Sequence, residues 1–329
     1  MKLAGGTSLA LATAALALAP AGAGAQATVP GCTPAMNIEA IVDDSTSMAF
    51  RDFGELRRTS LELFTRLGGN ERKTLGAVEF GSGADTLFAP QPIATGRRAM
   101  VSALRARINA DNGGTNYDAG FLKASQDNPS ATARVFLTDG ANDGLYRNAH
   151  RGGGRTYVVG LRLGAPDTGD PTAGRLLQIA TETGGTYFPA SDPAALQPIF
   201  NAVSAAAACL PPPRSFTTRL FTRAGQASAR SARVSGSTRR VDLVLSWAQP
   251  NNGLVFSSVQ ALGRAGRVIA DLGGGVRQRK LRVRRATGPT FQVLTVAKPR
   301  GTRRIRFRIA ATRVFRREPA VAQLSERVR

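Results

Sequence analysis

The sequence of 329 residues contains a single histidine and only two cysteines. One histidine, His150, excludes a histidine-rich metal site and most acid–base triads. Two cysteines cannot hold a zinc knuckle or an iron–sulfur cluster. Any metal chemistry must therefore use oxygen ligands.

Long hydrophobic runs are also missing. The apolar run at residues 9–19 is well short of the roughly 20 residues that a membrane-spanning helix needs. It follows Lys2 and precedes the small-residue stretch Ala25, Gln26 and Ala27, a pattern typical of a secretory signal peptide. A retained anchor is the alternative, which the short length disfavours. We expect residues 1–27 to be removed, leaving no transmembrane segment in a secreted or cell-surface protein.

The two cysteines are expected to be paired, because exported proteins meet an oxidising environment. Cys32 lies just before the first apolar strand, and Cys209 lies just after the last helix of the same segment. A bridge would clamp both ends of one domain. Two buried free thiols are the alternative.

Acidic residues are scarce in the last third of the chain. Residues 28–213 carry 17 Lys+Arg and 18 Asp+Glu, whereas residues 214–329 carry 26 and 4. The net charge of +22 therefore belongs to the second segment. Three prolines at 211–213 coincide with the change and cannot continue a helix. We predict a domain at 28–210, a Pro-rich linker at 211–214 and a basic domain at 215–329.

The first domain alternates strand and helix patterns, which predicts an α/β fold with a mostly parallel sheet covered on both faces. Strands are expected at residues 38–42, 75–80, 86–90, 133–137, 156–163 and 186–188, and helices at 55–67, 99–108, 174–183 and 193–208. The basic domain shows short strands at 241–247, 253–260, 280–283, 291–296 and 304–310. This pattern predicts an all-β sandwich, with Trp247 in its core.

Oxygen-bearing side chains follow two strands of the first domain. Asp43, Ser45 and Ser47 come after the first strand, Asp139 follows the strand at 133–137, and Thr115 lies in a glycine-rich loop between them. Alone, each motif is only a helix cap or a turn. In this order, the five residues resemble the metal-ion-dependent adhesion site (MIDAS) of the von Willebrand factor A (VWA) family.

The resemblance covers residues 28–210 and implies a Rossmann-like, doubly wound sheet of strand order 3-2-1-4-5-6. It also implies that Ser45, Ser47 and Thr115 touch a metal directly, while Asp43 and Asp139 hold its waters or exchange into its ligand shell. The sequence departs from the family at Thr46, where glycine is frequent.

Hydroxyl, water and carboxylate oxygens suit Mg²⁺, and Mn²⁺ or Ca²⁺ are alternatives. An open metal position can accept an acidic side chain from a partner. The nearby Asp44 and Asp118 are expected to be solvated or capping residues, and Asp143 and His150 to lie in a solvated loop.

These features predict a binding or adhesion module that holds a protein or matrix ligand through a divalent cation, and not an enzyme. One alternative is an envelope structural or assembly protein whose basic β domain binds anionic polymers. A Mg²⁺-dependent phosphohydrolase is another, but it needs a second aspartate where Ser45 stands.

Arginines alternate with apolar residues at Arg304, Arg306 and Arg308, which places them on one face of a strand. Such a stripe can bind anionic surface polymers, or it is simply a solvated face. Nucleic acid is disfavoured because interleaved aromatic residues for base stacking are missing.

Overall fold

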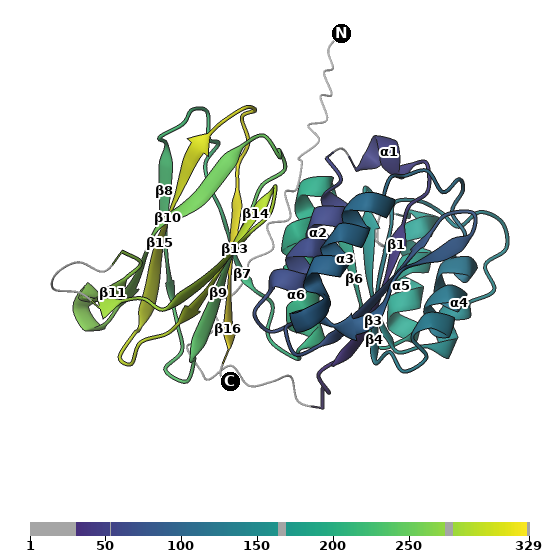
Figure 1. Cartoon of the computed structure of the whole chain (residues 1–329), viewed down its shortest axis with the longest axis horizontal. Helices are drawn as coiled ribbons and strands as arrows, with labels where there is room; N and C mark the ends of the chain where they lie inside the picture. The colour runs from purple at the N-terminus through teal and green to yellow at the C-terminus, as the bar shows by residue number, and fades with distance from the viewer. Residues whose placement is uncertain (1–30, 53, 164–168, 274–278, 328–329) are drawn as a thin grey trace, which may run out of the picture.

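The computed structural model describes residues 31–52, 54–163, 169–273 and 279–327. The predicted signal peptide, residues 1–27, lies outside them. The described chain forms an α/β half and an all-β half that lie side by side (Figure 1). No helix in the described ranges has the length and apolar character needed to cross a membrane.

The α/β half is built on a six-stranded sheet of order β3-β2-β1-β4-β5-β6. All neighbouring strands are parallel except β2 and β3. This confirms the mostly parallel sheet and the strand order that the resemblance implies. The strands are β1 (Asn37–Asp43), β2 (Thr74–Phe80), β3 (Ala84–Pro92), β4 (Ala133–Thr138), β5 (Arg155–Leu161) and β6 (Thr186–Ala190).

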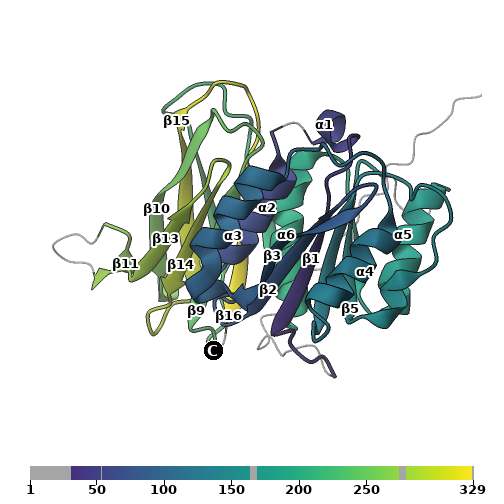
Figure 2. The same ribbon diagram turned by 45° about the vertical axis from the view of Figure 1, so that its right-hand side comes forward.

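Helices cover both faces of this sheet, as Figure 2 shows. The helices α2, α3 and α6 pack against one face, and α4 and α5 against the other. Along β1, Ile38, Ala40 and Val42 join the first core cluster while Ile41 joins the second, because successive strand residues point to opposite faces. The helices are α1 (Met48–Arg51), α2 (Leu56–Arg66), α3 (Ile93–Arg107), α4 (Tyr117–Asp127), α5 (Pro171–Glu182) and α6 (Leu196–Ala207), with 3-10 turns η1 (Ala149–Gly152) and η3 (Pro193–Ala195).

Helix α3 begins at Ile93 rather than at residue 99 as the sequence pattern predicted. Gly96 interrupts the pattern, because glycine is a poor helix former. In the fold, Gly96 is buried and a Cβ there would meet the side chain of Gln91 at 2.3 Å. Close packing between β3 and α3 therefore explains the glycine.

The all-β half consists of two five-stranded sheets, of orders β12-β11-β10-β15-β8 and β13-β14-β9-β16-β7. One hydrophobic cluster, which includes Leu243, Phe256, Phe307 and Trp247, contains residues of both sheets, as a sandwich requires. The elements are β7 (Arg214–Thr217), β8 (Ala227–Arg233), β9 (Arg240–Ser246), β10 (Gly253–Leu262), η4 (Arg264–Gly266), β11 (Val268–Asp271), β12 (Arg279–Lys280), β13 (Val283–Thr287), β14 (Phe291–Ala297), β15 (Arg304–Arg313) and β16 (Val321–Arg327).

The prediction of one strand at residues 280–283 was wrong. The chain crosses there from β12 in one sheet to β13 in the other. Leu281 is buried in the core between the sheets, and its backbone N–H donates to Asp271 O at 2.7 Å. Burial of Leu281 therefore directs the chain from one sheet to the other, although the sequence pattern at 280–283 is that of one continuous strand.

The two halves pack closely against each other. Leu63 and Leu67 at the end of α2 form a cluster with Val244, Phe291 and Val293 of β9 and β14. Polar contacts surround this cluster: Gln197 Nε2 donates to Thr290 Oγ1 at 2.5 Å, and Asn201 Nδ2 donates to Gln323 Oε1 at 2.9 Å. Apolar burial and satisfied polar groups together fix the halves relative to each other.

The expected disulfide is present between Cys32 and Cys209, with a Cα–Cα distance of 5.7 Å. Beside it, the backbone N–H of Ala35 donates to Ala207 O at 2.7 Å. The bridge therefore ties the segment before β1 to the end of α6.

Replacing Cys32 and Cys209 together by serine should lower the free energy of unfolding by about 2–5 kcal/mol, because the bridge closes a long loop in the unfolded chain. Urea denaturation measures this change, and reduced wild-type protein should match the variant. Equal stability of the oxidised protein and the variant would contradict a structural role for the bridge.

Candidate metal centre

The candidate site lies where β1 and β4 end. These neighbouring strands are parallel, with Val42 opposite Leu137, so Asp43 and Thr138 leave the same edge of the sheet. From β1 the chain continues to β2 on one side and later crosses to β4 on the other. Sites in open parallel sheets form at such a reversal of strand order.

The turn after β1 is organised by hydrogen bonds to Asp43. Its Oδ1 accepts from the backbone N–H of Ser45 at 2.9 Å, and its Oδ2 accepts from Thr138 Oγ1 at 2.5 Å. Asp43 is fully buried and Ser45 is 1% exposed. The Asp43 carboxylate thus fixes the turn on the end of β4.

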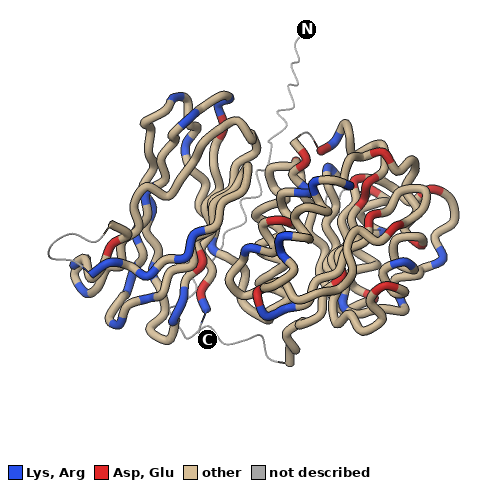
Figure 3. The backbone as a smooth tube through the Cα atoms, in the orientation of Figure 1, with Lys and Arg blue, Asp and Glu red and all other residues tan. Residues whose placement is uncertain are grey.

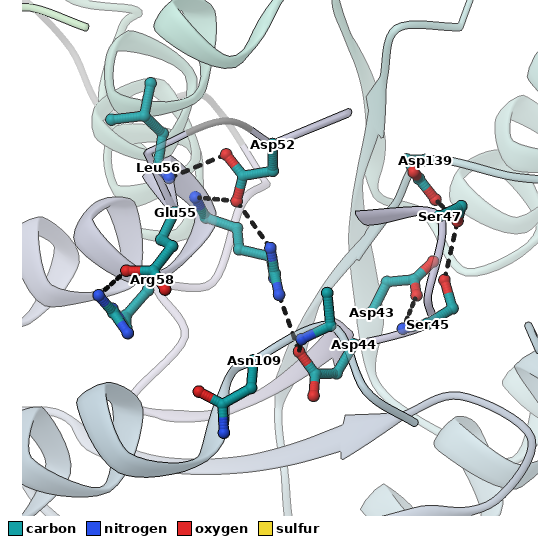
Figure 4. Close-up of polar contacts among 12 residues, drawn as sticks. Asp43, Asp44, Ser45, Ser47, Asp52, Glu55, Leu56, Arg58, Asn109 and Asp139 are labelled. Carbon is teal, nitrogen blue, oxygen red and sulfur yellow. Dashed lines mark hydrogen bonds and ion pairs between the residues drawn. The ribbon is translucent and has the colours of Figure 1, made fainter. Parts of the chain in front are cut away.

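Three of the predicted residues form a chain of oxygens, visible in Figure 4. Ser45 Oγ lies 3.0 Å from Ser47 Oγ, and Ser47 Oγ donates to Asp139 Oδ1 at 2.8 Å. Asp43 adds to this chain through its hydrogen bond with the backbone of Ser45. The fold thus brings together four residues that lie up to 96 positions apart in the sequence.

Thr115 approaches from the glycine-rich loop between α3 and α4. A Cβ on Gly140 would lie 3.9 Å from Thr115 Oγ1, so this hydroxyl is next to the segment that carries Asp139. Asp143 Oδ2 accepts from the Thr115 backbone N–H at 2.6 Å. All five predicted residues therefore lie at this edge of the sheet.

Thr46, the departure from the family pattern, strengthens the loop. Its backbone N–H and its hydroxyl both donate to Gly113 O at 2.9 Å. Gly113 has φ +69, a conformation that costs glycine little. Thr46 thereby holds the Thr115 loop against the turn after β1.

Burial dominates the electrostatics of the site. The pKa of Asp43 is raised to about 6: burial is the main cause, hydrogen bonds from Ser45 and Thr138 oppose the shift, and the charge of Asp139 adds to it. Burial also raises the pKa of Asp139, against the hydrogen bond from Ser47 and the charge of Arg51. Two buried carboxylates so close together favour a proton or a cation between them.

One carboxylate oxygen of Asp139 accepts no hydrogen bond within the described chain and could therefore bind such a cation. Its Oδ2 is buried and has no hydrogen-bond partner among the described residues, and Arg51 Nε lies 3.8 Å away. Within those residues, no three His, Cys, Asp or Glu side chains gather into a metal-binding group. A cation here would therefore need the serine and threonine hydroxyls as well, and an oxygen set of this kind fits Mg²⁺.

Two arginines that the sequence analysis did not single out support the site. Arg51 on α1 donates to Asp139 O. Arg57 on α2 is 2% exposed and donates from Nη2 to Asp44 Oδ1 at 2.8 Å and from Nη1 to Asp52 Oδ2 at 2.9 Å. Asp44 is thus a buried ion-pair partner and not a solvated residue, and it fixes the turn to α2.

The loop after β4 makes more contacts with the rest of the fold than the sequence analysis predicted. His150 is fully buried, with Nδ1 2.6 Å from Tyr146 Oη and Nε2 2.9 Å from Glu182 Oε2. Asp118 accepts from the backbone N–H groups of Arg147 and Ala149 at 2.6 and 3.0 Å. The expectation of a solvated loop was wrong for His150, because aromatic packing and a carboxylate partner let the ring be buried.

A family model described as the von Willebrand factor type A domain matches residues 37–202, about half of the chain. No curated protein sequence matches the chain.

Several solved structures are similar at low sequence identity. A von Willebrand factor type A protein from Catenulispora acidiphila is 18% identical with a TM-score of 0.45, and the match covers 90% of this chain and 63% of that one. The PilB minor pilin from Streptococcus sanguinis is 15% identical with a TM-score of 0.43, covering 54% and 62%. The pilus adhesin SpaC from Lactobacillus rhamnosus GG is 13% identical with a TM-score of 0.43, covering 90% and 44%. The chain spans less than two thirds of each of these proteins.

Replacing Arg57 by methionine should destabilise the protein by about 3–5 kcal/mol, because Asp44 and Asp52 would be left buried and unpaired. The matched control is Arg58→Met, since the ion pair of Arg58 with Glu55 is partly exposed and should contribute less than about 1 kcal/mol. Urea unfolding of both variants measures the difference. Equal effects would contradict the role assigned to Arg57.

Proposed function

The chain belongs to the von Willebrand factor type A family, and on this premise we propose that it is a secreted or cell-surface adhesion module. It binds a protein or matrix ligand through a divalent cation held at a MIDAS-type site. The disulfide between Cys32 and Cys209 supports a location outside the cytoplasm, where such bridges persist.

The observation that carries this proposal is the line of oxygens from Ser45 through Ser47 to Asp139, which ends at a buried carboxylate oxygen without a hydrogen-bond partner in the described chain. A buried carboxylate oxygen that accepts no hydrogen bond is costly, and the ion pair of Asp139 Oδ2 with Arg51 Nε is long, at 3.8 Å. A cation bound to this oxygen would offset the cost.

Each residue of the site has a role in this proposal. The hydroxyls of Ser45, Ser47 and Thr115 would bind the cation, and Asp43 and Asp139 would hold its water ligands and balance its charge. A bound Mg²⁺ or Mn²⁺ would supply an electrophilic position for a carboxylate oxygen of the partner.

The surroundings of the site suit a protein ligand. Phe50 on α1 is 70% exposed and Leu145 in the loop after β4 is 82% exposed. Phe50 follows Ser47 by three residues, and Leu145 follows Asp139 by six. Exposed apolar side chains in the segments that carry site residues favour a partner that places an acidic side chain among apolar neighbours.

The decisive variant is Asp139→Ala, which removes the carboxylate at the end of this line of oxygens. It should abolish Mn²⁺ or Mg²⁺ binding in isothermal titration calorimetry and should abolish capture of partners from a cell-surface fraction, as EDTA does for the wild type. Asp85→Asn is the matched control, because Asp85 is an exposed carboxylate on β3, and the strand β2 separates β3 from β1. Cation binding that survives Asp139→Ala would overturn the proposed site.

Cation affinity should fall as the pH drops from about 7 to 5, since protons compete with metals for carboxylates and burial raises the pKa of Asp43 to about 6. Below this pKa, Asp43 is protonated and cannot balance the charge of the cation. Mn²⁺ titrations across this range measure the effect. Ser47→Ala should weaken binding but keep the same pH midpoint, and a pH-independent affinity would contradict the role of Asp43.

A further inference from the structure

Two arginine-lined cavities lie beside each other on the face formed by α2, α3 and the edge of the β half. The larger has a volume of about 840 Å³ and the smaller about 440 Å³. We call them together the arginine groove. Their arginines are Arg66, Arg97, Arg98 and Arg105 in the larger cavity and Arg240, Arg282 and Arg284 in the smaller one.

Glu71 connects the two cavities. It lines the smaller one, and its Oε1 pairs both with Arg97 Nη2 of the larger cavity at 3.4 Å and with Arg284 Nη1 of the smaller one. The groove therefore crosses the boundary between the halves, where Figure 3 shows basic segments on both sides.

The arginines of the groove outnumber the carboxylates that pair with them. Glu62 is shared by Arg66 and Arg105, at 3.3 and 2.9 Å, and Glu71 is shared as described above. Arg98, Arg240 and Arg282 have no ion-pair partner within the described ranges. Guanidinium groups gathered without enough carboxylates repel each other, and an anionic ligand would relieve this repulsion.

We infer that the arginine groove binds a linear anionic polysaccharide whose sulfate or carboxylate groups recur along the chain. This inference goes beyond the proposed metal-dependent function. Arg98 and Arg105 lie two helical turns apart on α3, about 10 Å along its axis, and the groove continues from there to β13. A single small anion cannot contact arginines over this length, whereas a repeating one can pair with several guanidinium groups.

The lining residues favour a polysaccharide over a nucleic acid. None of the residues that line either cavity is aromatic, so unpaired bases would find no stacking surface. The small residues Ala94, Thr95, Ser102 and Ala106 line the larger cavity together with the arginines and leave space for sugar rings.

The groove shares no residue with the candidate metal centre. It is also separate from the arginine stripe of β15, where Arg304, Arg306 and Arg308 are exposed and alternate with buried Ile305 and Phe307. In this proposal, polyanions therefore bind to arginines from both halves and not to β15, the strand with the densest basic sequence.

The test uses a size-defined heparin oligosaccharide, with affinity measured by calorimetry at several salt concentrations in the presence of EDTA. The variant Arg98→Gln with Arg282→Gln removes one unpaired arginine from each half. The control, Arg306→Gln with Arg308→Gln, removes the same charge from β15. We expect at least a tenfold loss of affinity and a shallower salt dependence for the groove variant, and a change of less than twofold for the control.

The named alternatives have distinct outcomes. Equal losses in both variants would overturn the groove and indicate diffuse charge attraction, and binding abolished by EDTA would place the ligand at the metal centre. A single-stranded DNA of matched charge that binds more tightly than heparin would overturn the polysaccharide assignment. Polygalacturonate in place of heparin separates carboxylate from sulfate recognition, and failure of both polymers to bind would refute the proposal. Circular dichroism melting verifies that both variants are folded.

Discussion

The burial of helix α2 between the two halves is the constraint on which the rest of the structure depends. Nine of its eleven residues are buried, although a surface helix normally exposes its polar face. Leu61 and Phe64 pack into the core under the α/β sheet, while Leu63 packs against β9 and β14. A helix held on both sides cannot rotate or shift without opening both cores, so the side chains that it carries are fixed in position.

Three of those side chains link the functional surfaces. Arg57, near the start of α2, holds Asp44 and so the turn that carries Ser45 and Ser47. Glu62, in the middle, is 2% exposed and pairs with Arg66 and Arg105 of the arginine groove. Thr59 lies 3.3 Å from Thr290 of the β half through their hydroxyls. The candidate metal centre, the groove and the boundary between the halves therefore share one rigid support.

The two proposed binding surfaces differ in their physical basis. The candidate metal centre consists of buried oxygens held by short hydrogen bonds, and a cation bound there would be suited to selecting one acidic side chain. The groove uses exposed guanidinium groups in excess, which attract a polymer over a longer range and in a salt-dependent manner. A module with both could be held near anionic surface material by one surface while the other engages a specific ligand.

The sequence by itself determined the alternation of strands and helices in the α/β half and the sandwich class of the β half, and it pointed to the five oxygen-bearing residues of the candidate site, because each depends on local pattern or on a short motif. It did not determine that Arg51 and Arg57 support the site, that His150 is buried, or that the strand at 280–283 is a crossing between sheets. Short strands such as β8 (Ala227–Arg233), whose residues are alanine, serine and arginine, also carry no hydrophobic pattern to recognise.

Only the tertiary structure decided where the charge acts. The excess of arginine is evident in the sequence, but its most concentrated run, on β15, differs from the groove, whose arginines come from α2, α3, β9 and the segment around β13. Likewise, the polar residues Thr59, Ser60 and Thr65 of α2 look solvent-facing in sequence, yet they are buried. The distant residues Gln197 and Thr290 both donate to Thr59, and a contact between segments far apart in the chain leaves no periodic signal in either one.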